Sequence, residues 1–312
     1  MKAKCLYCYK ELETGIDYHE HCSKKFFGTT EAPILGYSLA EISELAKDVI
    51  ERRISVPGVQ AKLSLALSEK TANDSQTRLT VVGALGGRYI FKPATVQYPY
   101  MPENEHLTMR LAELFEIPVV TSSLIRLKSG ELSYITKRKD RTTKGEKIHM
   151  LDMFQILEAY DKYKGSMEKV GKAVLTYSSN TLLDARNLFE ITVFCFLVGN
   201  NDMHLKNFSL IQTNHGWCLA PAYDLLNVAI LMPEDTEELA LTLAGKKRKL
   251  TKQIFIDFAV FLQLNEKQIS HVFSSIEAKN KKAIELIHQS FLPAEIQEKY
   301  IQLFEERLKV FK

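Results

Sequence analysis

The chain has 312 residues, of which 46% are hydrophobic and 25% charged. This composition is typical of a soluble globular protein that is large enough for a sizeable core and for two lobes. The net charge is only +3, so no global electrostatic field favours nucleic acid as the main partner. The five cysteines do not form a disulfide framework, because three fall within the first 22 residues while Cys195 and Cys218 stand alone in apolar surroundings. That pattern indicates a reducing compartment and a local metal site.

Targeting and membrane segments are not expected. The first residues, MKAKC, lack the apolar core of a signal peptide. The most apolar run, residues 191–198, is far shorter than the ~20 residues that a membrane span requires. We therefore expect a soluble, cytoplasmic protein that does not associate with a membrane.

The predicted elements are mixed in the first half of the chain and helical in the second. Apolar residues at helical spacing predict helices over residues 38–52 and 103–116. Strands are expected over residues 61–67, 88–92 and 132–136, the second of them ended by Pro93. From about residue 150 onward helical patterns dominate, including residues 182–198, 252–264 and 296–311.

This division predicts a small α+β lobe followed by a larger helical lobe, with an active site between them, since clefts between lobes are common ligand sites. A charged stretch, KRKDR at residues 137–141, lies near the expected boundary. The simpler interpretation is that most of its side chains are solvated on the surface. We expect a Cys/His unit over residues 1–28, the small lobe over residues 37–140 and the helical lobe over residues 141–312.

The N-terminal unit carries two clusters of metal-ligand residues, CLYC at residues 5–8 and HEHC at residues 19–22. Soft thiolates with one imidazole suit a tetrahedral zinc site. The expected ligands are Cys5, Cys8, His19 and Cys22, with His21 as the alternative imidazole. Zinc would stabilise a unit too small to build its own core. Because four protein ligands leave no open position, we expect a scaffold or docking element; the alternative is a set of free buried cysteines.

Two further segments have the chemistry of phosphate binding. Gly58, in the segment SVPGVQAK at residues 55–62, allows backbone N–H groups to approach a phosphate, although Pro-Gly is primarily a turn signal. Lys92 ends an apolar strand and can reach nucleotide phosphates, or it can simply extend into solvent at the sheet edge. Glu105 can pair with Lys92, or it can be a favourable charge near a helix N-terminus.

Residues 200–224 form the most informative segment. A strand is expected over residues 208–211, a turn over residues 214–216 and a returning strand over residues 217–219. If these strands pair as a hairpin, Asn207 falls opposite roughly Ala222. Asp224 is then brought back beside Asn207.

The residues at the base of this hairpin form a set suited to phosphoryl transfer. Asp202 can orient a nucleophilic hydroxyl, while Asn207 and Asp224 offer the hard oxygen ligands that magnesium prefers. Asn, Asp and Gly in a turn can also serve only the turn. His204 is either a brace for the loop or a proton-transfer group. Lys206 either counters the charge of a transferred phosphoryl group or is simply exposed.

Taken in order, these motifs resemble one known family. The match consists of SVPGVQAK (residues 55–62), FKP (91–93), NE (104–105), NDMHLKN (201–207) and AYD (222–224). The chain resembles the HipA-like serine/threonine kinases, the toxin components of bacterial toxin–antitoxin modules, over roughly residues 37–310. The ordered set is specific where each motif alone is not. The resemblance implies a two-lobed protein-kinase-like fold and the use of ATP and Mg²⁺.

The resemblance also implies a role for each matched residue. It makes Asp202 catalytic, with His204 and Lys206 beside it, and makes Asn207 and Asp224 magnesium ligands. Lys92, with Glu105, would stand on the nucleotide side. The expected phosphate loop comprises Ser55, Val56, Gly58, Val59, Gln60 and Lys62.

Regulation and partners are implied in the same way. Ser55 matches the autophosphorylated serine of the family, and the added negative charge would repel ATP and displace the loop. The implied partners are a protein substrate, such as an aminoacyl-tRNA synthetase, and a helix-turn-helix antitoxin through which any contact with DNA would be indirect. The family's N-terminal β-rich subdomain has no counterpart here and is expected to be missing or encoded as a separate small protein.

Departures from the family pattern leave alternatives. Arg53 replaces the first serine of the Ser-Ile-Ser run found in related short kinases. The expected adenine-binding hinge, residues 135–139, is basic where acidic and aromatic residues are expected, so no adenine contact is assigned. A small-molecule kinase is the nearest alternative enzyme. A catalytically silent module that sequesters nucleotide or antitoxin is the alternative from another class.

Overall fold

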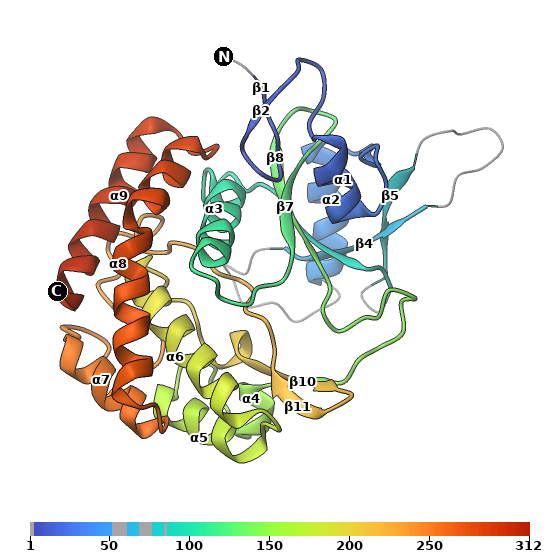
Figure 1. Ribbon diagram of the computed structural model, residues 1–312. Coiled ribbons are helices and arrows are strands. Elements are labelled where there is room, and N and C mark those ends of the chain that lie inside the picture. Colours follow the sequence, from blue (N-terminus) through green and yellow to red (C-terminus); the bar gives the residue numbers. More distant parts are fainter. Residues whose placement is uncertain (1–2, 52–60, 69–76, 84–85) are drawn as a thin grey trace. The chain divides into compact units, whose positions relative to one another are not determined.

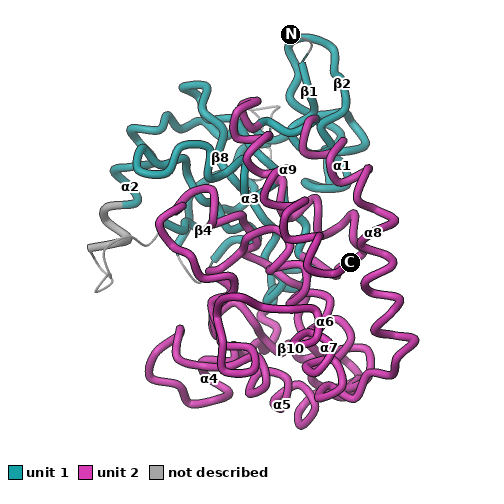
Figure 2. The backbone as a smooth tube through the Cα atoms, turned by 90° about the vertical axis from the view of Figure 1, so that its left-hand side faces the viewer, with its two compact units in different colours: residues 1–106, 120–146, 289–291 teal, residues 107–119, 147–288, 292–312 magenta. Residues whose placement is uncertain are grey.

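The computed structural model describes residues 3–51, 61–68, 77–83 and 86–312. Most of the expected phosphate loop, namely Ser55, Val56, Gly58, Val59 and Gln60, lies outside the described residues; Lys62 lies within them and is exposed. The chain divides into two compact units, drawn in different colours in Figure 2. One comprises residues 1–106, 120–146 and 289–291, and the other residues 107–119, 147–288 and 292–312.

The first unit is built on a six-stranded sheet with the strand order β3-β5-β4-β6-β8-β7. Its neighbouring strands are antiparallel, except that β3 runs parallel to β5. The strands are β3 (Ile34–Leu35), β4 (Leu63–Leu67), β5 (Arg78–Val82), β6 (Tyr89–Lys92), β7 (Ser122–Arg126) and β8 (Leu132–Lys137). The same unit holds β1 (Ala3–Lys4), β2 (Glu11–Leu12), α1 (Glu20–Phe27), α2 (Leu39–Glu51) and the start of α3 (Met101–Leu114).

The core of this unit lies between the sheet and helices α1 and α2, which cover one of its faces (Figure 1). Leu63 and Leu65 point into this core, as the alternating pattern in β4 predicts. The three strands expected here are confirmed to within two residues. The short edge strand β3 lies between the expected Cys/His unit and the expected small lobe, and β3, β5 and β7 were not predicted.

Helix α3 is buried more completely than its apolar stripe predicts. Leu107 and Leu111 are buried as expected, but so are the polar residues Glu103, Asn104, Glu105 and His106. Buried polar side chains require partners, so this helix must be held by specific contacts as well as by its leucines.

The second unit is mainly helical and includes a three-stranded sheet with the order β11-β10-β9. Its strands are β9 (Met150–Asp152), β10 (Ser209–Thr213) and β11 (Gly216–Leu219). Its helices are α4 (Met153–Ile156), α5 (Met167–Tyr177), α6 (Thr181–Leu197), α7 (Lys252–Phe261), α8 (Glu266–Gln289) and α9 (Ala294–Leu308), with the 3₁₀ turns η1 (Leu205–Asn207) and η2 (Lys309–Phe311).

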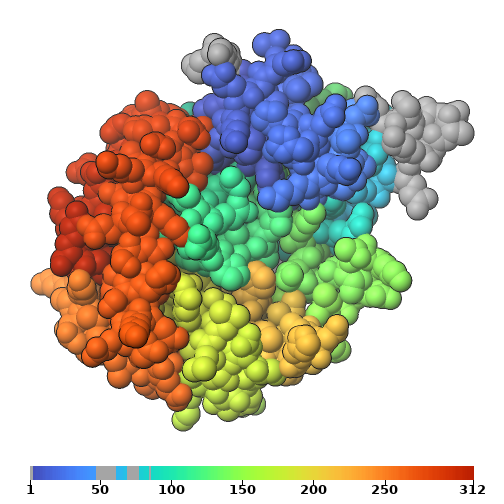
Figure 3. All heavy atoms as spheres, viewed as in Figure 1, coloured from blue at the N-terminus to red at the C-terminus, as the bar shows by residue number. Residues whose placement is uncertain are grey.

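Helices α6 and α8 illustrate two kinds of burial in this unit. In α6 apolar side chains surround the axis, as in Phe189, Phe194 and Phe196, and the helix is buried among α5, α7 and α9. In α8 the buried residues form a single stripe, and the other side of the helix lies open on the face shown in orange in Figure 3. No helix in the described part of the chain is both long and apolar enough to cross a lipid bilayer.

Candidate functional site

The polar loop 200–207 begins where α6 ends, at a glycine. Gly199 has a positive φ of 71° and follows the C-cap residue Val198, the position where left-handed glycine commonly ends a helix. A Cβ at this position would lie 2.5 Å from Leu303 Cδ2. The carbonyl of Gly199 accepts hydrogen bonds from the backbone N–H groups of Val228 and Ala229. The start of the loop is therefore fixed by close packing and by its own backbone.

Within the loop, backbone and amide groups hold Asp202 in place. The backbone N–H of Asp202 donates to Asn200 Oδ1 at 3.2 Å. The backbone carbonyl of Asp202 accepts from His204 N–H at 2.8 Å and from Asn207 Nδ2 at 3.1 Å. Because Asn207 uses the NH₂ end of its amide in this bond, its carbonyl oxygen is the end that can ligate a cation. Asp202 and Asn207 are thus brought together, as the sequence predicts.

The carboxylate of Asp202 accepts a hydrogen bond from Tyr163, a residue outside all of the sequence motifs. The phenol oxygen lies 2.6 Å from Asp202 Oδ1, and the ring packs edge-on against His204 at 5.1 Å between centroids. Burial, together with this hydrogen bond to a carboxylate, raises the pKa of Tyr163. The phenol therefore stays protonated and donates to the oxygen that would orient a substrate hydroxyl. The contact of His204 with Tyr163 is consistent with a structural role for His204 in supporting the loop. A proton-transfer role for His204 stays a prediction.

The hairpin β10–β11 has the register predicted from the sequence. Leu210 lies opposite Leu219 and Thr213 opposite Gly216, which is the register that the prediction assumed. The ladder ends before Asn207, which lies in η1, while Ala222 forms a bridge with Val119. The backbone N–H of Ala220 donates to the carbonyl of Ser209, which continues the ladder towards the base. The segment that carries Asp224 therefore returns to the segment that carries Asn207.

Tyr223 fastens these two segments together. Its hydroxyl lies 2.6 Å from Ser209 Oγ and donates to the carbonyl of Lys206 at 3.0 Å. Asp224 follows with a positive φ of 61°. Such a φ is uncommon for a residue other than glycine, is more often found for Asp and Asn, and clusters at functional sites. The backbone is thus held in a left-handed turn where it presents a carboxylate.

Lys206 is the exposed member of the loop. Its ammonium lies 4.6 Å from the centroid of the Phe154 ring, within the range of a cation–π contact. This contact directs the side chain along α4. A role in countering phosphoryl charge stays a prediction.

Lys92 and Glu105, in the first unit, form a buried ion pair. Lys92 Nζ lies 2.6 Å from Glu105 Oε1, and the two side chains are 5% and 1% exposed. The ammonium also lies 5.3 Å from the centroid of the Tyr134 ring. The predicted pairing is confirmed, and the reading of Lys92 as a lysine extending into solvent is wrong. A buried charge pair of this kind is strongly disturbed by the loss of either partner.

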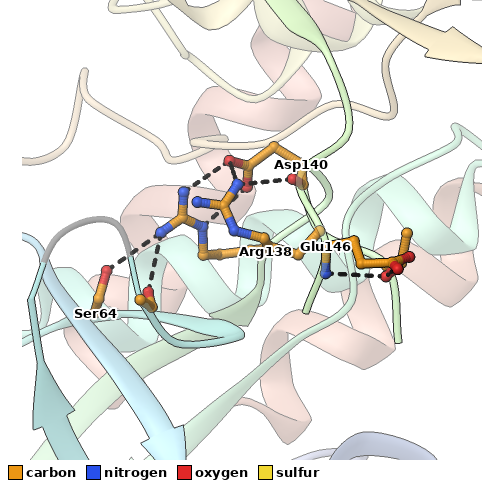
Figure 4. Close-up of polar contacts among 7 residues, drawn as sticks. Ser64, Arg138, Asp140 and Glu146 are labelled. Atoms are coloured by element: carbon orange, nitrogen blue, oxygen red, sulfur yellow. Dashed lines mark hydrogen bonds and ion pairs between the residues drawn. The ribbon is translucent and has the colours of Figure 1, made fainter. Parts of the chain in front are cut away.

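The basic residues of the expected hinge region are engaged within the chain. Arg138 makes a two-pronged ion pair with Asp140 and also donates to Ser64 Oγ and the carbonyl of Gly86 (Figure 4). Arg141 donates to Asp140 Oδ2, the oxygen that Arg138 Nη2 also contacts. Burial acts to raise the pKa of Asp140, but the hydrogen bond and charges of the two arginines outweigh it and lower that pKa. This network ties the segment after β8 to β4.

The N-terminal Cys/His residues gather into one cluster. One ligand atom from each of Cys5, Cys8, His19 and Cys22 lies within 4.8 Å of the others, and this group can hold a metal ion. His19 Nδ1 lies 3.5 Å from Cys8 Sγ and 3.8 Å from Cys22 Sγ. These spacings are close to the roughly 3.3–3.8 Å edges of a tetrahedron built on zinc–ligand distances of about 2.0–2.3 Å.

The surroundings of His19 favour it over His21 as the imidazole ligand. His19 Nε2 lies 3.0 Å from the carbonyl of Glu11, so donating its proton there leaves the Nδ1 lone pair for the cluster. The hydrogen bond from Cys8 lowers the pKa of the Cys5 thiol against the opposing effect of burial. A thiolate is the form that binds metal.

Comparison with known proteins identifies relatives of this chain. The family described as "HipA-like C-terminal domain" matches residues 54–287. A Haemophilus influenzae protein named "Putative kinase" is 27% identical over 274 residues, which cover 78% of this chain and 77% of that protein. The "Serine/threonine-protein kinase toxin HipA" of Shewanella oneidensis is 27% identical over 206 residues, which cover 60% of this chain and 45% of the toxin. The chain therefore spans less than half the length of that toxin.

Among solved structures, the fold is similar to one from the Shewanella oneidensis toxin–antitoxin complex of HipA, HipB and operator DNA. The TM-score is 0.65 at 21% identity, with 85% of this chain and 70% of that chain covered. At this identity the likeness establishes the α+β fold.

Proposed function

The chain belongs to the family of HipA-like C-terminal domains, and from that membership we propose that it is an ATP- and magnesium-dependent serine/threonine-protein kinase. The observation that carries the proposal is the base of the β10–β11 hairpin. There the loop of Asp202 and Asn207 meets the returning segment of Asp224 through the Tyr223 hydroxyl. A turn with a purely structural role would not require the carboxylates of Asp202 and Asp224 together with the amide of Asn207.

The residues divide the work of phosphoryl transfer. Asp202 accepts the proton of the substrate hydroxyl and orients it. Asn207 and Asp224 hold magnesium, which supplies charge neutralisation to the phosphates when bound. Lys92, kept in place by Glu105, contacts the nucleotide phosphates. Positioning and electrostatics, rather than a covalent enzyme intermediate, would provide the rate enhancement.

The proposed domain organisation is that of a two-lobed kinase with residues 37–140 as the small lobe and residues 141–312 as the helical lobe. We propose that residues 55–62 form the phosphate loop. Autophosphorylation of Ser55 would add negative charge beside the triphosphate and switch the kinase off.

The partners follow from the relatives. One relative carries the name of a kinase toxin, and the structural neighbour was solved with an antitoxin and operator DNA. We propose that this chain is likewise the toxin of such a pair, that a helix-turn-helix antitoxin binds it, and that DNA is contacted only through that antitoxin. Its substrate would be a protein, with aminoacyl-tRNA synthetases as the first class to examine.

The cysteine cluster is proposed to hold zinc. Three thiolates and one imidazole form a donor set that favours zinc, and four protein ligands close the site against catalysis. The role proposed for the metal is structural.

The kinase proposal is tested by incubating the purified protein with Mg²⁺ and γ-labelled ATP after its intact mass has been measured. Wild-type protein should acquire phosphate at Ser55 and should label proteins in an extract. Asp202→Ala should reduce both signals by about 10²-fold or more, the usual effect of removing a general base. Asp257→Ala removes a carboxylate on α7 and serves as the matched control that retains activity.

Two outcomes would overturn the proposal. Wild-type protein that is initially unphosphorylated, binds ATP and transfers no phosphate would be a silent binding module. Transfer to small hydroxylated metabolites, with proteins left unlabelled, would identify a small-molecule kinase.

A further inference from the structure

Tyr9 links the Cys/His cluster to the rest of the first unit. It follows Cys8 directly, and its backbone N–H donates to the carbonyl of Cys5 at 2.9 Å. Its φ is 67°, an uncommon value for a bulky residue, and the side chain is 2% exposed. The turn that brings Cys5 and Cys8 together is therefore the turn that aims Tyr9 inward.

The target of Tyr9 is helix α3. Its hydroxyl lies 2.9 Å from Nδ1 of His106, and the two rings meet edge-on with centroids 5.2 Å apart. His106 is fully buried. The contact is thus a buried hydrogen bond, which the low dielectric of the interior makes stronger than the same bond in water.

His106 adjoins Glu105, whose carboxylate holds Lys92 at 2.6 Å. Successive side chains of an α-helix point about 100° apart. Within one turn of α3, His106 therefore points towards Tyr9 while Glu105 points towards Lys92. Because a helix moves as a rigid element, a shift at His106 is also a shift at Glu105.

The Cys/His unit is anchored on its other side by the sheet. The backbone N–H of Leu124 in β7 donates to the carbonyl of Leu6 at 3.2 Å, and the Tyr18 hydroxyl donates to the carbonyl of Leu124. The unit therefore connects β7 to α3, and its position relative to the sheet is fixed independently of Tyr9.

We propose that the metal cluster positions α3 through Tyr9 and His106, and so sets the Lys92–Glu105 pair for ATP. Tyr9 and His106 are positioning residues: neither touches nucleotide, and both act through Glu105. This inference rests on the proposed kinase function, because only in a nucleotide site does the placement of Lys92 affect ATP binding.

The test compares two tyrosine variants of the same unit. Tyr9→Phe removes the hydroxyl that reaches α3, whereas Tyr18→Phe removes a hydroxyl that reaches β7. Calorimetry with Mg-ATP should show about fivefold weaker binding for Tyr9→Phe, the effect expected of one hydrogen bond, and unchanged binding for Tyr18→Phe. In turnover assays the ATP KM should rise with little change in kcat.

A zinc-selective chelator, used with Mg²⁺ retained, should weaken ATP binding by wild-type protein at least to the level of Tyr9→Phe. The same treatment should weaken ATP binding by Tyr9→Phe by a smaller factor than it weakens binding by wild type, since part of its effect acts on the connection that Tyr9→Phe has already removed. Should Tyr9→Phe fail to fold, His106→Leu and His106→Asn provide the second comparison. Asn retains a polar group near the position of Nδ1 and should restore the affinity that Leu loses.

Amide hydrogen exchange separates failure of this inference from failure of the kinase proposal. Exchange over residues 101–106 should rise in Tyr9→Phe but not in Tyr18→Phe, whether or not ATP binds. Unchanged exchange there, or equal ATP affinities for the two variants, overturns the inference. Wild-type protein that does not bind ATP overturns the function while the exchange result still decides the coupling.

Discussion

Glu103, near the start of α3, is a carboxyl group whose environment disfavours its charge. It is 9% exposed, and burial raises its pKa from the ordinary 4.5 to about 7. In the folded protein the group therefore stays protonated at pH values where it is ionised in the unfolded chain. Between pH 4.5 and 7 the folded state binds more protons, so the free energy of unfolding falls as pH rises through this window.

Replacing Glu103 with Gln should remove this dependence, because the amide keeps the shape and cannot ionise. Between pH 5 and pH 8 the wild-type protein should lose roughly 2 kcal/mol more unfolding free energy than Glu103→Gln. This loss is below the upper limit set by about 1.36 kcal/mol for each unit by which the pKa is raised. Urea unfolding at both pH values measures the difference. Glu277→Gln, at an exposed position of α8, is the control and should follow the wild type; if Glu103→Gln did so too, the carboxyl would be ionised in the folded state.

At the same scale, the proposed site depends on tyrosines whose hydrogen-bond partners the sequence did not predict. Tyr163 donates to Asp202, Tyr223 joins the strands beside Asn207 and Asp224, and Tyr9 reaches His106. Each is one of 13 tyrosines in the chain. A tyrosine has an apolar body and a single polar tip, so its sequence neighbours do not reveal where the hydroxyl will find a partner.

The hairpin β10–β11 is the element on which the candidate magnesium site depends. Its turn consists of residues 214–215 between the paired Thr213 and Gly216, and Gly216 has a φ of 105°. The buried Asp184 of α6 fixes the hairpin to the helix, because its carboxylate accepts from Leu219 N–H at 2.6 Å. A displacement of this turn would alter the register that returns Asp224 to Asn207.

Gly216→Ala should be costly for two separable reasons. The positive φ disfavours any Cβ by about 1–2 kcal/mol, and a Cβ here would lie 2.1 Å from Ser179 Oγ. Gly130, in the turn between β7 and β8, has a φ of 104° with nothing within 4 Å of such a Cβ. Gly130→Ala therefore measures the backbone cost alone.

We expect Gly216→Ala to lose at least ~1 kcal/mol more unfolding free energy than Gly130→Ala, the lower end of the usual cost of overpacking. Urea unfolding of both variants supplies the comparison. Equal losses would mean that Ser179 moves aside freely and does not constrain the hairpin.

On the scale of the whole molecule, the Cys/His residues are part of the core of the first unit. Cys5, Leu6, Tyr18 and Phe26 belong to one buried cluster with residues of the sheet, including Ile135. A metal bound by these residues would hold that core as well as its own loop.

Metal removal should therefore destabilise the first unit as a whole. Elemental analysis should find about one zinc per chain. Chelation should lower the melting temperature and increase hydrogen exchange in β7 and β8. Cys8→Ser should lose the metal, while Cys218→Ser, outside the cluster, should retain it. Reduced, carefully purified protein without zinc would remove the metal proposal and leave the kinase proposal standing.

How much of this protein its sequence predicts depends on how far apart the contacting residues lie. Hairpin register is local, since one turn fixes which residues face each other, and the pairing of Leu210 with Leu219 follows from the turn at residues 214–216. The paired spacing of the cysteines and the order of the kinase-like motifs can likewise be recognised from the sequence alone. These features determined the family and the candidate residues.

Tertiary structure alone decided which distant groups the tyrosine hydroxyls contact. Tyr163 and Asp202 are 39 residues apart, and Tyr9 and His106 are 97 residues apart. Periodicity predicts which face of an element is apolar, but it carries no information about the distant group that a buried hydroxyl or carboxylate will contact. The sequence thus determined the chemistry available to this protein. Packing of the sheet, α3 and the N-terminal unit decided that the predicted Lys92–Glu105 pair is buried and that the Cys/His unit reaches the same helix through Tyr9.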